Sequence, residues 1–157
     1  MTTIVYDGER IAADRMVIHG DGIKIQYSKI KTGTLTRTYH GIATNESVYL
    51  ASTGYLMSAL VMEKWILESG NPSDFPKLED GCATIVIYIT DPKTAYIYFN
   101  SGPHPMLVTT FPTAIGSGAN YALCAMEVGA SIEKAVEIAA KFDDNTGFGV
   151  EVFKIQP

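Results

Sequence analysis

Apolar and polar residues alternate along much of the first forty residues, in short runs that are typical of β-strands. Residues 2–7 and 10–16 are two such runs on either side of Asp7-Gly8, a dipeptide that suits a tight turn with positive φ. We therefore predict a hairpin at the N-terminus. A second pair of strands is predicted over 23–31, where Ile and Tyr alternate with polar residues, and over 34–42, which is rich in Thr and Tyr.

A longer apolar segment follows and predicts a helix over 46–68. Thr44 or Asn45 can cap its start, and Ser69-Gly70-Asn71-Pro72 stops it. Its apolar residues cover most of the helix circumference, so we expect burial on more than one side. The segment is interpreted either as an ordinary core helix or as one with a neighbouring subunit against one face.

The second half of the chain predicts strands, two helices and a final strand. The expected strands are 82–90, 95–100, 106–110, 113–115 and 150–155, and the expected helices are 119–128 and 131–142. Ser131 is the expected N-cap of the second helix. This order predicts an α+β fold with helices on both faces of stacked antiparallel sheets, in a single domain over 1–157.

Composition narrows the range of functions. We expect no nucleic-acid partner, because the net charge is −5 and the basic residues are scattered. The longest apolar stretch, 48–67, is too polar for a membrane span, and the N-terminus has no signal-peptide pattern, so we expect a cytoplasmic protein with no membrane partner. Cys82 and Cys124 are expected to be reduced thiols with a packing role.

Candidate chemistry begins at Thr2. If Met1 is removed, Thr2 carries a hydroxyl nucleophile and a free α-amine on one residue, so that the amine can act as the base. Its reference pKa of about 7.7 to 8.0 leaves an appreciable neutral fraction at pH 7. The alternative is that Met-Thr-Thr merely starts an edge strand. The three histidines have no spacing typical of metal ligands, and we expect neither a metal nor a cofactor.

Several short motifs, in order along nearly the whole chain, resemble the proteasome β-subunit and HslV family of threonine-type N-terminal nucleophile hydrolases. They are Thr2-Thr3-Ile4-Val5, Ala12-Ala13-Asp14, Ser28-Lys29-Ile30, Ile115-Gly116-Ser117-Gly118 with Tyr121-Ala122, and Asp143-Asp144-Asn145-Thr146-Gly147. The resemblance implies a four-layer αββα sandwich. Each motif is weak alone, and their combination is specific.

The resemblance also implies a role for six residues. Thr2 matches the nucleophile, Asp14 the aspartate at the end of the second strand, and Lys29 the active-site lysine. A lysine beside the threonine would lower the pKa of the amine and stabilise negative charge on the hydroxyl oxygen. Ser117, Asp143 and Thr146 match the polar network near the amine, with Thr146 in place of a serine.

The chain departs from the family pattern in three ways. The family has a glycine after the strand that leads into the first long helix, and our predicted helix places Thr44 or Asn45 there. The family's second helix is missing, because 71–81 is short and contains two prolines, which implies a reduced helix layer on one face. Met1 precedes Thr2, and while it is retained the α-nitrogen is an amide and not a base.

These observations lead to one main functional hypothesis. We expect an amide-bond hydrolase, a threonine-type endopeptidase that acts on peptides or unfolded proteins. The alternative is a catalytically inactive proteasome-like scaffold or binding subunit, which a retained Met1 favours. A third reading is hydrolysis of a small non-peptide amide. The resemblance further implies a homo-oligomer, such as a ring, and an ATPase unfoldase as partner.

Overall fold

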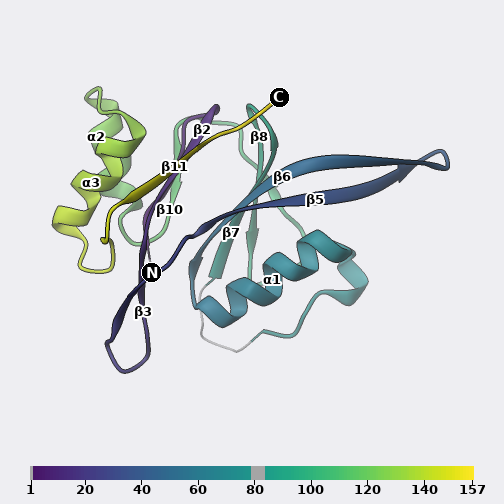
Figure 1. Cartoon of the computed structure of the whole chain (residues 1–157), viewed down its shortest axis with the longest axis horizontal. Coiled ribbons are helices and arrows are strands. Elements are labelled where there is room, and N and C mark those ends of the chain that lie inside the picture. Colours follow the sequence, from purple (N-terminus) through teal and green to yellow (C-terminus); the bar gives the residue numbers. More distant parts are fainter. Residues whose placement is uncertain (1, 79–83) are drawn as a thin grey trace.

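Two β-sheets pack face to face, and helices cover both outer faces (Figure 1). A computed structural model describes residues 2–78 and 84–157, with all of their side chains except those of 37–39. The first sheet has the strand order β10-β1-β2-β11, and the second has the order β5-β6-β7-β8-β9. The strands β3 and β4 form a separate two-stranded hairpin.

The element numbers follow chain order. The strands of the first sheet are β1 (Ile4–Tyr6), β2 (Arg10–Asp14), β10 (Thr113–Ile115) and β11 (Val150–Lys154). The second sheet contains β5 (Ile30–Tyr39), β6 (Ile42–Gly54), β7 (Thr84–Asp91), β8 (Thr94–Phe99) and β9 (Met106–Leu107). The separate hairpin is β3 (Met16–Ile18) and β4 (Lys24–Gln26). The helices are α1 (Leu56–Glu68), the 3-10 turn η1 (Pro72–Asp74), α2 (Ala119–Glu127) and α3 (Ile132–Phe142).

Alternation along the strands assigns each side chain to one layer. On β1, Ile4 and Tyr6 lie between the two sheets, whereas Val5 packs against α2 and α3. On β6, Val48 and Leu50 pack with α1, whereas Tyr49 and Ala51 face the first sheet. Full burial of an aliphatic side chain stabilises the fold by about 1.5 to 3 kcal/mol, so these continuous apolar runs stabilise three interfaces at once. The predicted four-layer αββα sandwich is confirmed.

The helix layer on the second sheet is reduced, as predicted. Within residues 2–78 and 84–157, α1 is the one α-helix that packs on this sheet, through Met62, Trp65 and Ile66. The short turn η1 follows it. The described residues also contain no helix that is both long and apolar enough to cross a membrane.

The prediction of a helix over 46–68 is wrong for its first ten residues. Residues 46–54 belong to β6, and α1 begins at Leu56. Val48 to Ala51 are buried on both faces of the sheet, and a strand covered on both faces has the same continuous apolar run as a buried helix. Gly54, at φ 103°, separates strand from helix, and Tyr55 stands at the N-cap position in place of Thr44 or Asn45.

The predicted pairing of 23–31 with 34–42 is also wrong. Strand β4 pairs with β3, and β5 pairs with β6 from Ile30↔Ala51 to Tyr39↔Ile42. The reason is the two-residue loop His40-Gly41, in which both residues have positive φ, as tight hairpin turns require.

The remaining predicted helices and strands are present where the structure describes them, with two main differences in extent. The strand predicted over 10–16 ends at Asp14, and Met16 begins β3; the strand predicted over 106–110 is only Met106–Leu107. The N-terminal hairpin pairs Ile4 with Ala13, and Ser131 caps α3 by accepting a hydrogen bond from the backbone of Lys134. The packing role predicted for Cys124 is wrong, because this thiol is exposed. The other cysteine, Cys82, lies outside the described residues.

Candidate active site

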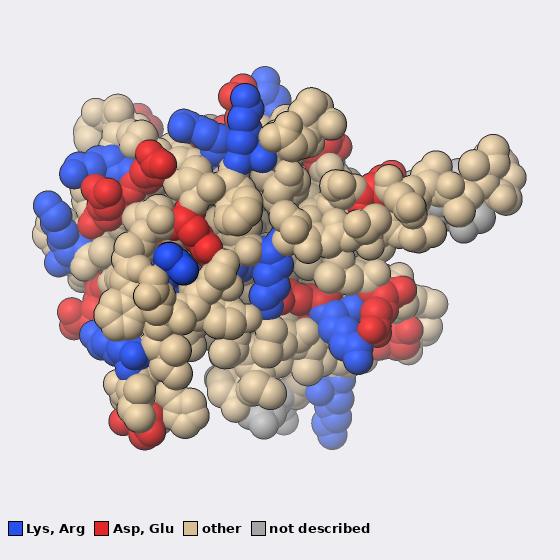
Figure 2. Space-filling view, in the orientation of Figure 1, with Lys and Arg blue, Asp and Glu red and all other residues tan. Residues whose placement is uncertain are grey.

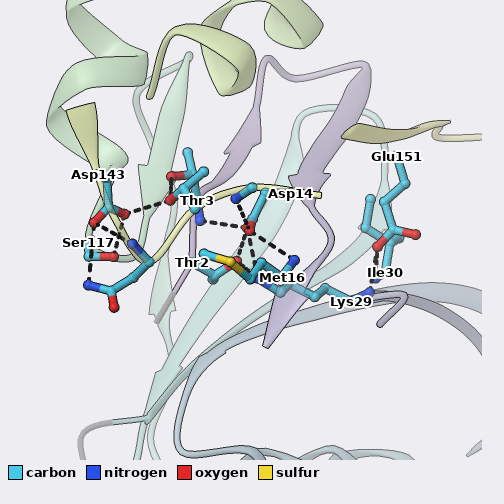
Figure 3. Close-up of polar contacts among 12 residues, drawn as sticks. Thr2, Thr3, Asp14, Met16, Lys29, Ile30, Ser117, Asp143 and Glu151 are labelled. Atoms are coloured by element: carbon cyan, nitrogen blue, oxygen red, sulfur yellow. Dashed lines mark hydrogen bonds and ion pairs between the residues drawn. The ribbon is translucent and has the colours of Figure 1, made fainter. Parts of the chain in front are cut away.

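The Thr2 hydroxyl lies between an acidic and a basic side chain (Figure 3). Thr2 lies two residues before β1, Asp14 ends β2, and Lys29 directly precedes β5. The hydroxyl donates a hydrogen bond to Asp14 Oδ1 and accepts one from Lys29 Nζ. Lys29 Nζ also lies 2.7 Å from Asp14 Oδ1. All three residues are at most 5% exposed, so these charges interact in a site from which most water is excluded.

Backbone amides fix the Asp14 carboxylate. Its Oδ1 accepts from the backbone N–H of Thr3 at 3.0 Å, and its Oδ2 accepts from Met16 at 3.1 Å and Gly147 at 3.0 Å. Hydrogen bonds to an ionised acceptor are stronger than those between neutral groups. The carboxylate is therefore held in place by the main chain on both oxygens, independently of the lysine.

Burial lowers the pKa of Lys29 below its ordinary value, because the charged ammonium loses its hydration. The nearby Asp14 carboxylate opposes this effect by stabilising the ammonium, through its charge and through the hydrogen bond. The negative charge of Glu151 acts in the same direction as Asp14. The ammonium group is thus a cation of reduced proton affinity beside the Thr2 hydroxyl.

Glu151 of β11 fixes the segment that carries Lys29. Its Oε1 accepts hydrogen bonds from the backbone N–H groups of Lys29 and Ile30, the latter at 2.9 Å, and its Oε2 accepts from the Ser28 hydroxyl at 2.6 Å (Figure 3). These contacts join the last strand of the first sheet to the edge strand of the second. They fix the position of the backbone from which the Lys29 side chain extends. The sequence contained no pattern that identified Glu151.

A second polar network lies on the other side of the N-terminal residues. Asp143 Oδ2 accepts from the Ser117 hydroxyl at 2.6 Å and from the Thr146 hydroxyl at 2.5 Å. Burial alone would raise the pKa of the Asp143 carboxyl, but hydrogen bonds from Ser117, Thr146 and Asn145 outweigh it and lower that pKa. The carboxylate form is therefore favoured here.

The second network contacts the N-terminal strand directly. The Thr146 hydroxyl is 2.7 Å from the Thr3 hydroxyl. A Cβ added to Gly116, at φ 103°, would lie 1.9 Å from the carbonyl oxygen of Thr2, and the backbone N–H of Gly118 donates to the same oxygen at 3.5 Å. The glycines on either side of Ser117 therefore permit the main chain to approach the nucleophile candidate closely.

A cavity of about 410 Å³ opens beside Thr2. Thr2, Lys29 and Gly54 line it, together with apolar residues of the β3–β4 hairpin and of α1. At another part of its wall, Lys31 Nζ lies 2.5 Å from Glu63 Oε2, and the Ser52 hydroxyl donates to the same carboxylate. The candidate nucleophile thus borders a space that can receive a ligand, with a charge pair on its wall.

The structure brings all six residues predicted from the sequence into these two networks, which are Thr2, Asp14 and Lys29, and Ser117, Asp143 and Thr146. The expectation that Thr44 or Asn45 follows the strand before the first helix is wrong. That place belongs to Gly54, at the end of β6. Sequence reasoning missed this because the helix was expected to start too early.

No protein-family model and no curated protein matches the chain. Among solved structures, HslV from Trypanosoma brucei is 18% identical, with 99% of each chain covered and a TM-score of 0.65. Anbu from Hyphomicrobium sp. strain MC1 is 13% identical over 99% of this chain and 82% of its own, with a TM-score of 0.69. Anbu from Pseudomonas aeruginosa, solved as a helical assembly, is 11% identical over 98% and 81%, with a TM-score of 0.63. The chain therefore has the proteasome-like fold of HslV and Anbu.

Proposed function

We propose that this protein is a threonine-type peptidase in which Thr2, freed by removal of Met1, is the nucleophile. The observation that carries the proposal is the buried Thr2 hydroxyl, hydrogen-bonded to both Asp14 and Lys29 at the wall of an open cavity. A hydroxyl nucleophile needs a base and a stabilised oxygen, and a buried cation beside the oxygen provides the second of these. The alternative, that Met-Thr-Thr merely starts an edge strand, does not account for these hydrogen bonds.

The proposed reaction has two stages. The α-amine of mature Thr2 takes the hydroxyl proton while Oγ1 attacks the peptide carbonyl, and the ammonium of Lys29 stabilises the negative charge on Oγ1. The proton then passes to the leaving amine as the C–N bond breaks, which leaves an ester on Thr2. Water, activated by the same amine, cleaves the ester and restores the hydroxyl. The backbone N–H of Gly54, which lines the cavity, is a candidate donor to the oxyanion.

The cavity favours a large apolar substrate side chain. Its walls are mainly apolar, with Val17, Ile18 and Met57 among the lining residues. Lys31 and Glu63 compensate each other's charge across 2.5 Å, so neither presents a net charge to the substrate. Burial alone would lower the pKa of Lys31, but hydrogen bonds to Glu63 and Tyr27 outweigh it and raise that pKa, which keeps Lys31 charged at neutral pH. We therefore infer cleavage after bulky hydrophobic residues.

Self-association is a further part of the proposal. The similar Anbu from Pseudomonas aeruginosa was solved as a helical assembly, and we propose that this chain also forms a homo-oligomer.

The test compares Thr2→Ala with Thr2→Ser in protein that has lost Met1, using fluorogenic peptides that end in a hydrophobic residue. The serine variant keeps a hydroxyl and an amine, and we expect it to keep measurable turnover. Loss of a covalent nucleophile removes the acyl-enzyme route, so the alanine variant should fall by at least about 1,000-fold. Equal turnover in Thr2→Ala and wild-type protein would refute the proposal.

A further inference from the structure

The hairpin of β5 and β6 extends far beyond the body of the protein (Figure 1). Register pairs run from Ile30↔Ala51 to Tyr39↔Ile42, but β7 pairs with β6 only over Tyr49–Gly54. The outer part, 34–47, which we call the arm, is therefore a ribbon of two strands. A two-stranded ribbon in water is marginally stable unless it gains a further strand or packs on another surface.

Both edges of the arm are open in the described structure. Strand β5 is the terminal strand of its sheet, and the part of β6 that belongs to the arm pairs with β5 alone. Soluble proteins usually protect such edges with charged residues, prolines or bulges. Within the arm, 34–47, the sequence contains no Lys, Asp or Pro, and Arg37 and Glu46 are its charged residues. In Figure 2 the described part of the arm carries few charged side chains, whereas the body carries many.

The side chains on one face of β5 suit pairing with an identical strand. Thr32, Thr34 and Thr36 occupy alternate positions and are exposed, so they share a face. On the opposite face, Gly33 lies against Leu67 of α1, where an added Cβ would lie 2.7 Å from Leu67 Cδ2. An antiparallel pair of two β5 strands with its two-fold axis at Thr34 would place threonines opposite threonines, a favourable cross-strand combination.

We propose that the arm is an assembly surface, in which β5 pairs in antiparallel fashion with β5 of a second copy of this chain. Charge permits this partner along β5. The protein carries a net charge of −5, so two copies repel each other in general, whereas β5, the strand that would pair, has no acidic residue. Projection of the arm also keeps the two charged bodies apart (Figure 2). The pairing extends the sheet across the two-fold axis and needs no ligand or catalytic step.

Charge complementation tests the pairing. The variants T34K/T36K and T34E/T36E add like charges along the β5 edge, and I42K/A43K is the matched control with the same added charge on β6. Light scattering at 100 µM should show wild-type protein with a mass of at least two chains. Each threonine variant should weaken association roughly 100-fold, because facing like charges cost several kcal/mol. An equimolar mixture of the two should regain the wild-type mass, and the control should keep it.

Three results would overturn the proposal: a wild-type mass of one chain at 100 µM, threonine variants that keep the wild-type mass, or a mixture that fails to regain it while both variants unfold at the wild-type temperature. The pairing rests on the proposed self-association, so a wild-type mass of one chain would contradict both. The proposed peptidase activity is tested separately, since none of the substituted residues lines the cavity beside Thr2.

Discussion

Replacement of Lys29 by methionine removes the cation from the candidate site and keeps a side chain of similar length and volume. In the folded protein the Lys29 side chain is 4% exposed, and its Nζ lies 2.7 Å from Asp14 Oδ1. Methionine therefore fills the same space but can neither neutralise the carboxylate nor donate a hydrogen bond to the Thr2 hydroxyl. The substitution isolates the charge from the packing.

The stability effect can be estimated from the contacts. At an effective dielectric constant of about 20, two unit charges at this distance attract by about 6 kcal/mol, and most of this is offset by the desolvation of both groups. Loss of one partner of a buried pair typically costs about 3 to 5 kcal/mol. Asp14 keeps three backbone N–H donors, so we expect the low end, about 3 kcal/mol. For the peptidase, loss of one electrostatic stabiliser predicts a fall in kcat of about 10² to 10³.

Two assays separate these effects. Urea unfolding gives the free energy of unfolding of Lys29→Met and wild-type protein, and steady-state peptide hydrolysis gives kcat at a temperature where both are folded. The pKa of Lys29 is lowered by folding, so between its folded value and about 10.4 the unfolded chain binds more protons and wild-type stability rises with pH. The free energy of unfolding of wild-type protein should therefore exceed that of Lys29→Met by an increasing amount as the pH rises through this range. Unchanged kcat, or a stability loss below about 0.5 kcal/mol, would refute the reasoning.

Three further substitutions test other parts of the site. Ser117→Ala removes a hydrogen bond that lowers the pKa of Asp143. The stability that the Asp143 carboxylate contributes above its unfolded pKa should therefore be lost at a higher pH during acid unfolding, and about 1 kcal/mol should be lost at pH 7. An unchanged midpoint of acid unfolding would contradict this. Glu151→Gln keeps an oxygen acceptor but removes a charge that raises the pKa of Lys29, so the alkaline limb of the pH–rate profile should move to lower pH, and an unmoved limb argues for a purely structural role. Gly116→Ala should destabilise by more than about 2 kcal/mol in thermal unfolding, because its φ is 103° and the new Cβ meets backbone, and wild-type stability would exclude this close approach.

The sequence predicted those residues of the candidate site that belong to short local motifs. Thr2 lies two residues before β1, and Asp14 ends β2, the antiparallel partner of β1. A tight turn at Asp7-Gly8 fixes the register of this pair, so local patterning was enough to place both residues. By contrast, Glu151 reaches Lys29 across two sheets. A single acidic residue in a strand has no local signature, and only the packing of the sheets makes that contact.

The fold was predictable in class, and two elements of it were not. The run Val48 to Ala51 is apolar on every side because β6 lies between α1 and the first sheet, and periodicity cannot distinguish this from a buried helix. Misplacement of the helix start then concealed Gly54 and the arm, since both depend on β6 being one long strand. Turn chemistry at His40-Gly41 was the signal that could have identified the hairpin.

The most direct test of the central claim is the intact mass of the protein before and after treatment with a peptide epoxyketone, which reacts with a hydroxyl and a free amine on the same N-terminal residue. The account predicts that protein lacking Met1 gains one adduct, and that the Thr2→Ala variant gains none. Protein that lacks Met1 and gains no adduct would contradict a competent Thr2 nucleophile. Retention of Met1 with no adduct would instead favour an inactive proteasome-like scaffold.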